Sequence, residues 1–210
     1  MDTTTTRAWP VLADLGGHDG AARLAKQVML LALGVAALTL AAKTQLPMWP
    51  SPVPVTMGTF AVLAIGAAYG PRLGLATIGT YMALGGLGAT VFAGDTAGWA
   101  YMTGATGGYL LGYLLATVLL GALARRGWDR SVGSMALAML LGNVAIYVPG
   151  VLWINRVIAD GAFDPAKYAT VWDQTLVWGL TPYLIGDAMK LALAALLLPA
   201  IWKLVGNARA

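Results

Sequence analysis

The sequence contains no cysteine and no glutamate, and its only histidine is His18. The lack of cysteine excludes disulfides, thiol catalysis and cysteine-ligated metals. Signature motifs of metalloproteases, serine hydrolases and P-loop ATPases are also missing. His18 stands in a polar N-terminal stretch, where a solvated side chain is expected. The sequence therefore predicts a protein that is not an enzyme and that carries neither a cofactor nor a metal.

Charge is scarce as well, since only 10% of the 210 residues are charged and 59% are hydrophobic. This balance is far too apolar for an ordinary soluble domain and indicates an integral membrane protein in contact with the lipid bilayer. The 27 glycines suit close helix packing in lipid. The net charge of +4 comes from basic residues scattered between apolar runs, which argues against a nucleic-acid partner.

Apolar runs separated by short connections predict an all-α integral membrane fold with six transmembrane helices. The expected spans are, approximately, residues 24–42, 57–69, 73–88, 105–124, 132–154 and 176–204. They form one compact domain, residues 23–206, between a cytoplasmic N-terminal tail at 1–22 with a short surface helix and a C-terminal tail at 207–210. The connection 43–56 holds four prolines, so it is expected to be extended and to cover something.

The distribution of Lys and Arg predicts the orientation of this bundle. With the N-terminus inside, nine basic residues fall on the cytoplasmic side, namely Arg7, Arg23, Lys26, Arg72, Arg125, Arg126, Arg130, Lys203 and Arg209. Only Lys43, Arg156 and Lys167 fall outside. This positive-inside bias predicts that both termini are cytoplasmic. The proline-rich connection, the glycine-rich loop 85–104 and the polar segment 155–173 would then gather on the outer face.

Two opposite charges, Asp187 and Lys190, interrupt the last apolar run. At three residues apart they share one face of a helix, and each charge inside a membrane costs about 2.5–3.5 kcal/mol on insertion scales. One interpretation is an ion pair that locks helix packing. The other is a polar clamp at the floor of a pocket, which suits a small solute with N–H donors at one end and a carboxylate at the other. Tyr109 and Tyr147 lie about one turn inside their spans, where a hydroxyl needs a partner.

Four short motifs occur in order along the chain and carry a family resemblance. They are Val53-Pro54-Val55-Thr56, Val91-Phe92-Ala93-Gly94, Thr106-Gly107-Gly108-Tyr109 and Gly186-Asp187-x-x-Lys190. Over residues 24–205 the chain resembles the BioY-type biotin transporter substrate-binding subunits, the S components of energy-coupling-factor (ECF) vitamin importers. The sequence departs from the family pattern at Gly58, where Gln is expected, and at Thr90 and Ala105, where Pro is expected.

The resemblance implies an ECF S-component-like bundle that captures biotin for uptake, under a cap formed by the loop after the first helix. It implies a multi-pass protein of the bacterial cell (inner) membrane that works with a transmembrane scaffold and ATP-hydrolysing subunits. ATP is used only by those partners. The pair Ala32 and Ala36 resembles the small-residue contact with the scaffold, and the sequence leaves open whether the chain also forms a homo-oligomer.

Biotin suits the predicted pocket, because its ureido ring offers two N–H donors that Asp187 can accept. Its valerate carboxylate could meet Lys190; alternatively, Asp187 and Lys190 pair with each other and touch only one end of biotin. The further contacts expected from the resemblance are Thr56, Tyr109, Tyr147, Phe92 and Asn143. Two rival functions are an S component for another small vitamin and, more distantly, an intramembrane enzyme with Asp187 as its base.

Overall fold

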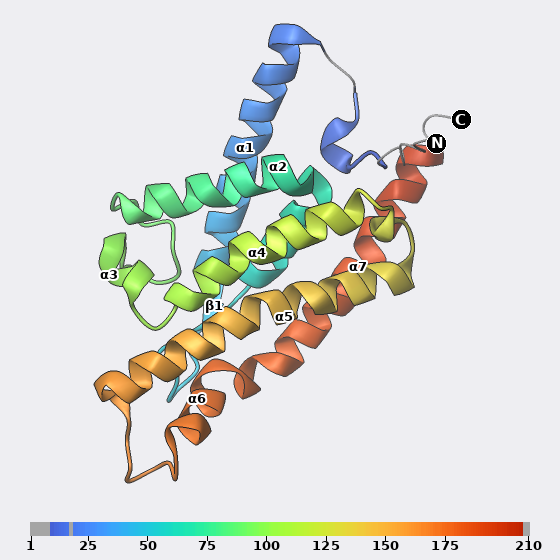
Figure 1. Ribbon diagram of the computed structural model, residues 1–210. Helices are drawn as coiled ribbons and strands as arrows, with labels where there is room; N and C mark the ends of the chain where they lie inside the picture. Colours follow the sequence, from blue (N-terminus) through green and yellow to red (C-terminus); the bar gives the residue numbers. More distant parts are fainter. Residues whose placement is uncertain (1–8, 17–18, 208–210) are drawn as a thin grey trace, which may run out of the picture.

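The computed structural model describes residues 9–16 and 19–207, so Arg7, His18 and Arg209 lie outside the described residues. The regular secondary structure of the described chain is helical apart from two short strands, β1 (Gln45–Leu46) and β2 (Val55–Thr56), which pair antiparallel with Gln45 opposite Thr56. The long helices are α1 (Gly20–Lys43), α2 (Gly58–Gly86), α4 (Gly107–Ala124), α5 (Val132–Val157) and α7 (Leu184–Asn207). The short elements are η1 (Leu12–Asp14), α3 (Gly98–Thr103), η2 (Trp128–Arg130), η3 (Ile158–Ala162), α6 (Val171–Gly179) and η4 (Thr181–Tyr183) (Figure 1).

Five helical stretches of the described chain are long and apolar enough to cross a membrane. One of them, α2, consists of two arms that fold back on each other at Gly70, whose φ of 76° and ψ of 178° are not helical. An ideal Cβ on Gly74 would lie 3.6 Å from the Cα of Gly66, although eight residues of continuous helix would span about 12 Å. The boundary between the predicted spans 57–69 and 73–88 lies at this reversal, which Pro71 reinforces because it has no N–H to donate.

The predicted sixth span, 176–204, is wrong as one continuous helix. Helix α6 ends at Gly179, and Leu180 leaves the helical region with a φ of −135° before η4 and α7 begin. Pro182 within η4 explains the break, because proline cannot complete the hydrogen bonding of a helix interior. Two predicted loops also contain helix: α3 lies within the segment 85–104, and α5 with η3 extends into the segment 155–173.

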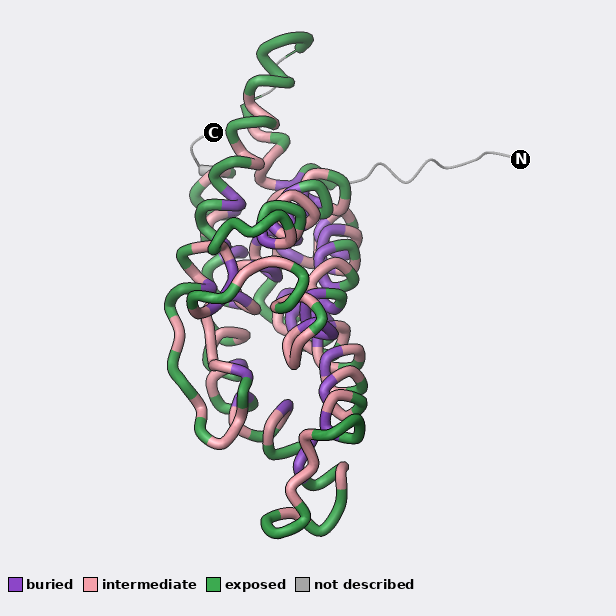
Figure 2. Tube along the Cα trace, turned by 90° about the vertical axis from the view of Figure 1, so that its left-hand side faces the viewer, coloured by how far each residue is buried: buried purple, intermediate pink, exposed green. Residues whose placement is uncertain are grey.

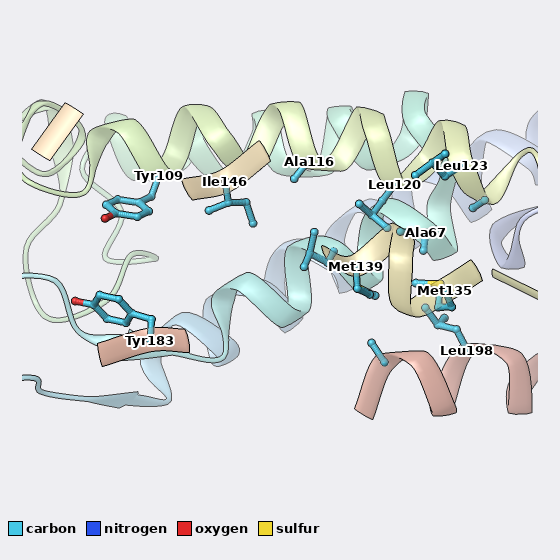
Figure 3. Packing of buried hydrophobic residues seen from close by; sticks show 14 of the residues in the cluster. Ala67, Tyr109, Ala116, Leu120, Leu123, Met135, Met139, Ile146, Tyr183 and Leu198 are labelled. Atoms are coloured by element: carbon cyan, nitrogen blue, oxygen red, sulfur yellow. The ribbon is translucent and has the colours of Figure 1, made fainter. Parts of the chain in front are cut away.

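Helix α4 lies between α2 and α5, and glycines permit the close approach on both sides. An ideal Cβ on Gly112 would lie 2.6 Å from the Cα of Ile146 on α5, and one on Gly121 would lie 2.4 Å from the backbone nitrogen of Pro71 on α2. Both positions therefore require glycine. Between the helices, Ala116 and Leu120 are buried in the larger hydrophobic cluster (Figure 3).

Helix α1 is the least buried of the long helices. Its inward face carries Gly34, Val35, Leu38 and Ala42, all buried. Ala32 and Ala36 lie on the exposed side of the same helix. Figure 2 shows the same division over the whole molecule, with buried positions on the inner turns of the helices and exposed positions on the outer turns.

The described start of the chain packs against the end of the bundle where α4 ends and α5 begins. Trp9 donates its backbone N–H to the carbonyl of Arg125 at 2.8 Å, and Val11 is fully buried. The guanidinium of Arg130 lies 3.4 Å from the ring centroid of Trp202 on α7 and 5.2 Å from that of Trp9. The residues before α1 and the last turns of α7 therefore meet at one end of the molecule.

Candidate functional site

A cavity with about 660 Å³ of empty space, mouth included, lies at the other end of the bundle, beneath β1, β2 and the proline-rich connection. It is walled by residues from seven elements, α1, β2, α2, α3, α4, α5 and α7, together with η4 and the neighbouring loops. Five of the seven predicted ligand contacts line it: Thr56, Tyr109, Tyr147, Asp187 and Lys190. These five residues come from four separate parts of the sequence, and the fold brings them together around one space.

Asp187 and Lys190 form an ion pair at this cavity, with 2.9 Å between Nζ and Oδ1. Both side chains are largely buried, at 6% and 12% exposure respectively. The first turns of α7 place them three residues apart on one helix face, as the sequence predicted. Since burial of either charge alone is costly, each residue makes the other tolerable at this depth.

The ammonium of Lys190 has acceptors for all three of its N–H groups. Besides Asp187, it donates to the backbone carbonyl of Thr56 at 2.7 Å and to the hydroxyl of Thr59 at 3.1 Å. These contacts join α7 to β2 and to the first turn of α2. All three N–H groups of Lys190 therefore donate to groups of the protein, and none is left for a ligand.

The carboxylate of Asp187 is held from two sides. Its Oδ1 accepts from Lys190 and, at 3.4 Å, from the hydroxyl of Thr59, and its Oδ2 accepts from the hydroxyl of Tyr147 on α5. Each carboxylate oxygen can accept two hydrogen bonds, so Oδ2 retains one free acceptor position. Asp187 therefore keeps hydrogen-bonding capacity for a ligand, whereas Lys190 does not.

Tyr109 and Tyr147 pack edge to face in the wall of the cavity, with ring centroids 6.2 Å apart. The hydroxyl of Tyr109 donates to the carbonyl of Gly179 at 2.7 Å, which joins α4 to the end of α6. Gly150 and Gly179 make room for this side chain, because a Cβ on either would lie within 2.7 Å of it. Tyr109, labelled in Figure 3, thus lines the cavity while its hydroxyl donates its proton to a backbone carbonyl.

Phe92 and Asn143 do not line the cavity. Phe92 is fully buried one layer behind the wall, where it stacks on Tyr101 at 4.5 Å and meets Tyr81 edge to face at 5.3 Å. Tyr81 and Tyr101 are the residues that face the space. Phe92 therefore supports the wall and is not itself exposed to the cavity.

Thr59, Tyr113 and Tyr183 are among the cavity residues that were not singled out from the sequence. Tyr113 could have been found, since it follows Tyr109 by four residues and so shares its helix face. A Cβ on Gly58 would approach the hydroxyl of Tyr113 to 3.0 Å, so this departure from the family pattern leaves room for the tyrosine. Thr59 had no such signal, because its partners are distant in the sequence.

Tyr183 fastens the proline-rich connection over the cavity. Its hydroxyl donates to the carbonyl of Val53 at 2.6 Å and lies 2.8 Å from the hydroxyl of Ser51. Ser51 in turn donates to the carbonyl of Trp178 on α6 at 2.6 Å. The connection is therefore held down by the side chain of Tyr183 in η4 and by a backbone carbonyl near the end of α6.

A second cavity, here called the vestibule, lies outside the first, with about 860 Å³ of empty space. It lies between the proline-rich connection and the loop that carries Ala93, Gly94 and Asp95. The two cavities share four lining residues, Pro54, Ala93, Tyr101 and Thr106. Burial raises the pKa of Tyr101, so this shared wall presents a neutral hydroxyl.

Within the described residues there is no cluster of three or more acidic, His or Cys side chains that could hold a metal ion. The inner cavity carries one carboxylate and one ammonium, already paired, and is otherwise lined by aromatic rings, hydroxyls and aliphatic groups. Linings of this kind are typical of sites for compact organic molecules with a few polar groups.

Known proteins resemble this chain in sequence and in fold. Residues 10–207 match the BioY family. A probable biotin transporter BioY of Pyrococcus horikoshii is 33% identical over 173 residues, which cover 82% of this chain and 94% of the relative. The biotin transporter BioY of Thermotoga maritima is 29% identical over 183 residues, which cover 85% and 97%. A crystal structure of the S-component for biotin from an ECF-type ABC transporter shares the fold, with a TM-score of 0.69, 20% identity and coverage of 89% and 95% of the two chains.

Proposed function

Because the chain belongs to the BioY family, we propose that it captures biotin as the substrate-binding S component of an ECF-type importer. The observation that carries the proposal is the buried pair Asp187 and Lys190, joined by Tyr147 at a cavity that is otherwise lined by aromatic rings, hydroxyls and aliphatic groups. Polar groups of this kind, few and fixed within an apolar space, orient a ligand. The chain itself does no chemistry, and ATP hydrolysis belongs to partner subunits.

Asp187 is proposed to receive the ureido ring. Its Oδ2 has a free acceptor position, and an N–H bond to a carboxylate is about twice as strong as a bond between neutral groups. A ligand carboxylate at the same place would meet the negative charge of Asp187 and would find no free donor on Lys190. The contacts therefore favour the second division of the two that the sequence left open, in which the pair touches only one end of biotin.

The wall around this end is proposed to consist of the ring of Tyr109, with Tyr113 and Ile146 on the neighbouring turns of α4 and α5. Thr56 contributes through its backbone carbonyl, which fixes Lys190, and through its side chain. Phe92 and Asn143 are left out of the proposed contacts, since neither lines the cavity. An apolar wall of this kind suits the thiophane ring and the methylene chain of biotin.

In the membrane, residues 23–206 are proposed to form a single six-span domain with both termini cytoplasmic and with the vestibule facing outward. The two arms of α2 count as two spans, which raises the five apolar helical stretches to six spans. The basic residues nearest the described termini support the proposed orientation. The exposed side of α1, with Ala32 and Ala36, is proposed to dock on the transmembrane scaffold, because small residues let two helices approach closely in lipid. The membrane is then the bacterial inner membrane.

The deciding experiment is equilibrium binding of labelled biotin to the purified chain in detergent, without partner subunits. We expect saturable binding at one site per chain, displaced by unlabelled biotin but not by thiamine or riboflavin. Displacement by another vitamin and not by biotin would leave the fold in place and refute the ligand. An absence of binding to folded chain would refute capture by this subunit alone.

A further inference from the structure

We propose that Lys43, at the end of α1, receives the carboxylate of the ligand at the boundary between the inner cavity and the vestibule. The inference rests on the proposed function and deepens it, since it assigns the end of biotin that Asp187 does not hold. It makes Lys43 a specificity-determining residue, one that separates biotin from uncharged derivatives of the same shape.

The position of Lys43 follows from its neighbours. Ala42 lines the inner cavity, and Ala93 lines both the inner cavity and the vestibule. Lys43 follows Ala42 directly, and its ammonium donates to the carbonyl of Gly94, the residue after Ala93 and itself part of the vestibule wall. The ammonium is thereby fixed beside the place where the two spaces adjoin.

The charges around the two cavities leave this role to Lys43. Lys190 is the one basic residue among the described residues that line either cavity, and its three donors are taken by Thr56, Thr59 and Asp187. Lys43 spends one donor on Gly94, and within the described chain no carboxylate lies within ion-pair distance of it. Its charge and its remaining N–H groups are therefore available to an anion.

A ligand that places its ureido ring against Asp187 has to direct its valerate away from the buried pair. The carboxylate is ionised at neutral pH and needs both solvent and a counter-charge. Lys43 offers both beside the vestibule, because its side chain is exposed to solvent and its ammonium contacts Gly94 of the vestibule wall. Asp95 lines the same vestibule, and its negative charge would repel the carboxylate of the ligand.

The test compares biotin with biotinamide, which has the same length but no carboxylate charge, on variants that change charge without removing bulk. For Lys43→Gln we expect binding of biotin to weaken about tenfold and binding of biotinamide to change less than about twofold. For Asp95→Asn we expect the opposite sign, with biotin binding tightened relative to biotinamide. The control is Lys167→Gln, on an exposed lysine paired with Asp164 at 2.9 Å, which should leave both affinities unchanged.

Equal losses of biotin and biotinamide in Lys43→Gln would overturn the proposal, because they would show that Lys43 only ties α1 to the loop at Gly94. Unchanged affinity for both ligands would overturn it as well. So would a loss confined to biotin in Lys190→Met, since the carboxylate would then lie at the buried pair. A wild-type protein that binds neither ligand would overturn the proposed function, and this inference with it.

Discussion

Removing either member of the buried pair should cost far more than removing both. Asp187→Asn leaves the ammonium of Lys190 at 12% exposure with only neutral acceptors, and Lys190→Met leaves the carboxylate of Asp187 at 6% exposure without a counter-charge. An unpaired buried charge typically costs about 3–5 kcal/mol of folding free energy. The double variant removes both charges, so we expect it to lie within about 2 kcal/mol of wild type. The coupling energy of the cycle is then about 4 kcal/mol or more.

The assay is a double-mutant cycle on the free energy of unfolding, measured by SDS titration in mixed micelles. Asp164 and Lys167 form the matched control, since they have the same spacing in sequence and the same 2.9 Å contact but are exposed at 35% and 60%. Exposed pairs couple by about 1 kcal/mol or less. Additive effects of Asp187→Asn and Lys190→Met would refute the reasoning, because the two residues could not then be neutralising each other inside the bundle.

The same variants bear on the ligand. Asp187→Asn should abolish or strongly weaken binding of biotin by protein that is still folded, because it removes the charged acceptor proposed for the ureido ring. Lys190→Met should weaken biotin and biotinamide to a similar extent, since its effect would be transmitted through Asp187. Isothermal titration calorimetry or equilibrium binding of labelled biotin to each variant checks both expectations, once circular dichroism has verified that the variant is folded.

Three further predictions concern the scaffold around the site. Gly112→Ala should destabilise the protein by about 2 kcal/mol or more, because its Cβ would meet the backbone of Ile146 at 2.6 Å, whereas Gly79→Ala, with nothing within 4 Å, should be neutral or stabilising in the same thermal unfolding assay. Tyr183→Phe should speed dissociation of biotin in stopped-flow experiments, because the hydroxyl that fastens the proline-rich connection is lost, at a stability cost of only about 1 kcal/mol. Burial raises the pKa of Asp129, so the folded state keeps the carboxyl proton to a higher pH than the unfolded chain does. The free energy of unfolding should therefore fall as the pH rises from about 4 to the folded pKa. Asp129→Asn should remove this part of the dependence of stability on pH.

Local patterns were enough to find the buried pair. Asp187 and Lys190 stood out because charge inside an apolar run is costly, and their i,i+3 spacing on a helix placed them together. The turn at Gly70 and Pro71 was also readable, since proline ends a helix wherever it occurs. The arms on either side fold back against each other as the two separate spans 57–69 and 73–88 required.

Features that depend on packing between distant segments were not predictable in the same way. Thr59 bridges Asp187 and Lys190 from the first turn of α2, and nothing in its neighbourhood in the sequence marks it. Phe92 was expected at the ligand because it belongs to a motif, but the absence of a side chain at Gly85 lets its ring sink behind the wall. The sequence shows which residues are unusual, while only the packed bundle decides which of them face the cavity.

Arg130 contacts both Trp9, near the start of the described chain, and Trp202, near its end, and so brings the two ends together. Residues near the two ends of the sequence are neighbours in space, so a short linker could join them while new termini are opened elsewhere. The exposed stretch around Ala166 and Lys167, between η3 and α6, offers a place for such an opening. The order in which the helices are connected is in this sense independent of the bundle they form, and a circularly permuted chain should build the same cavity.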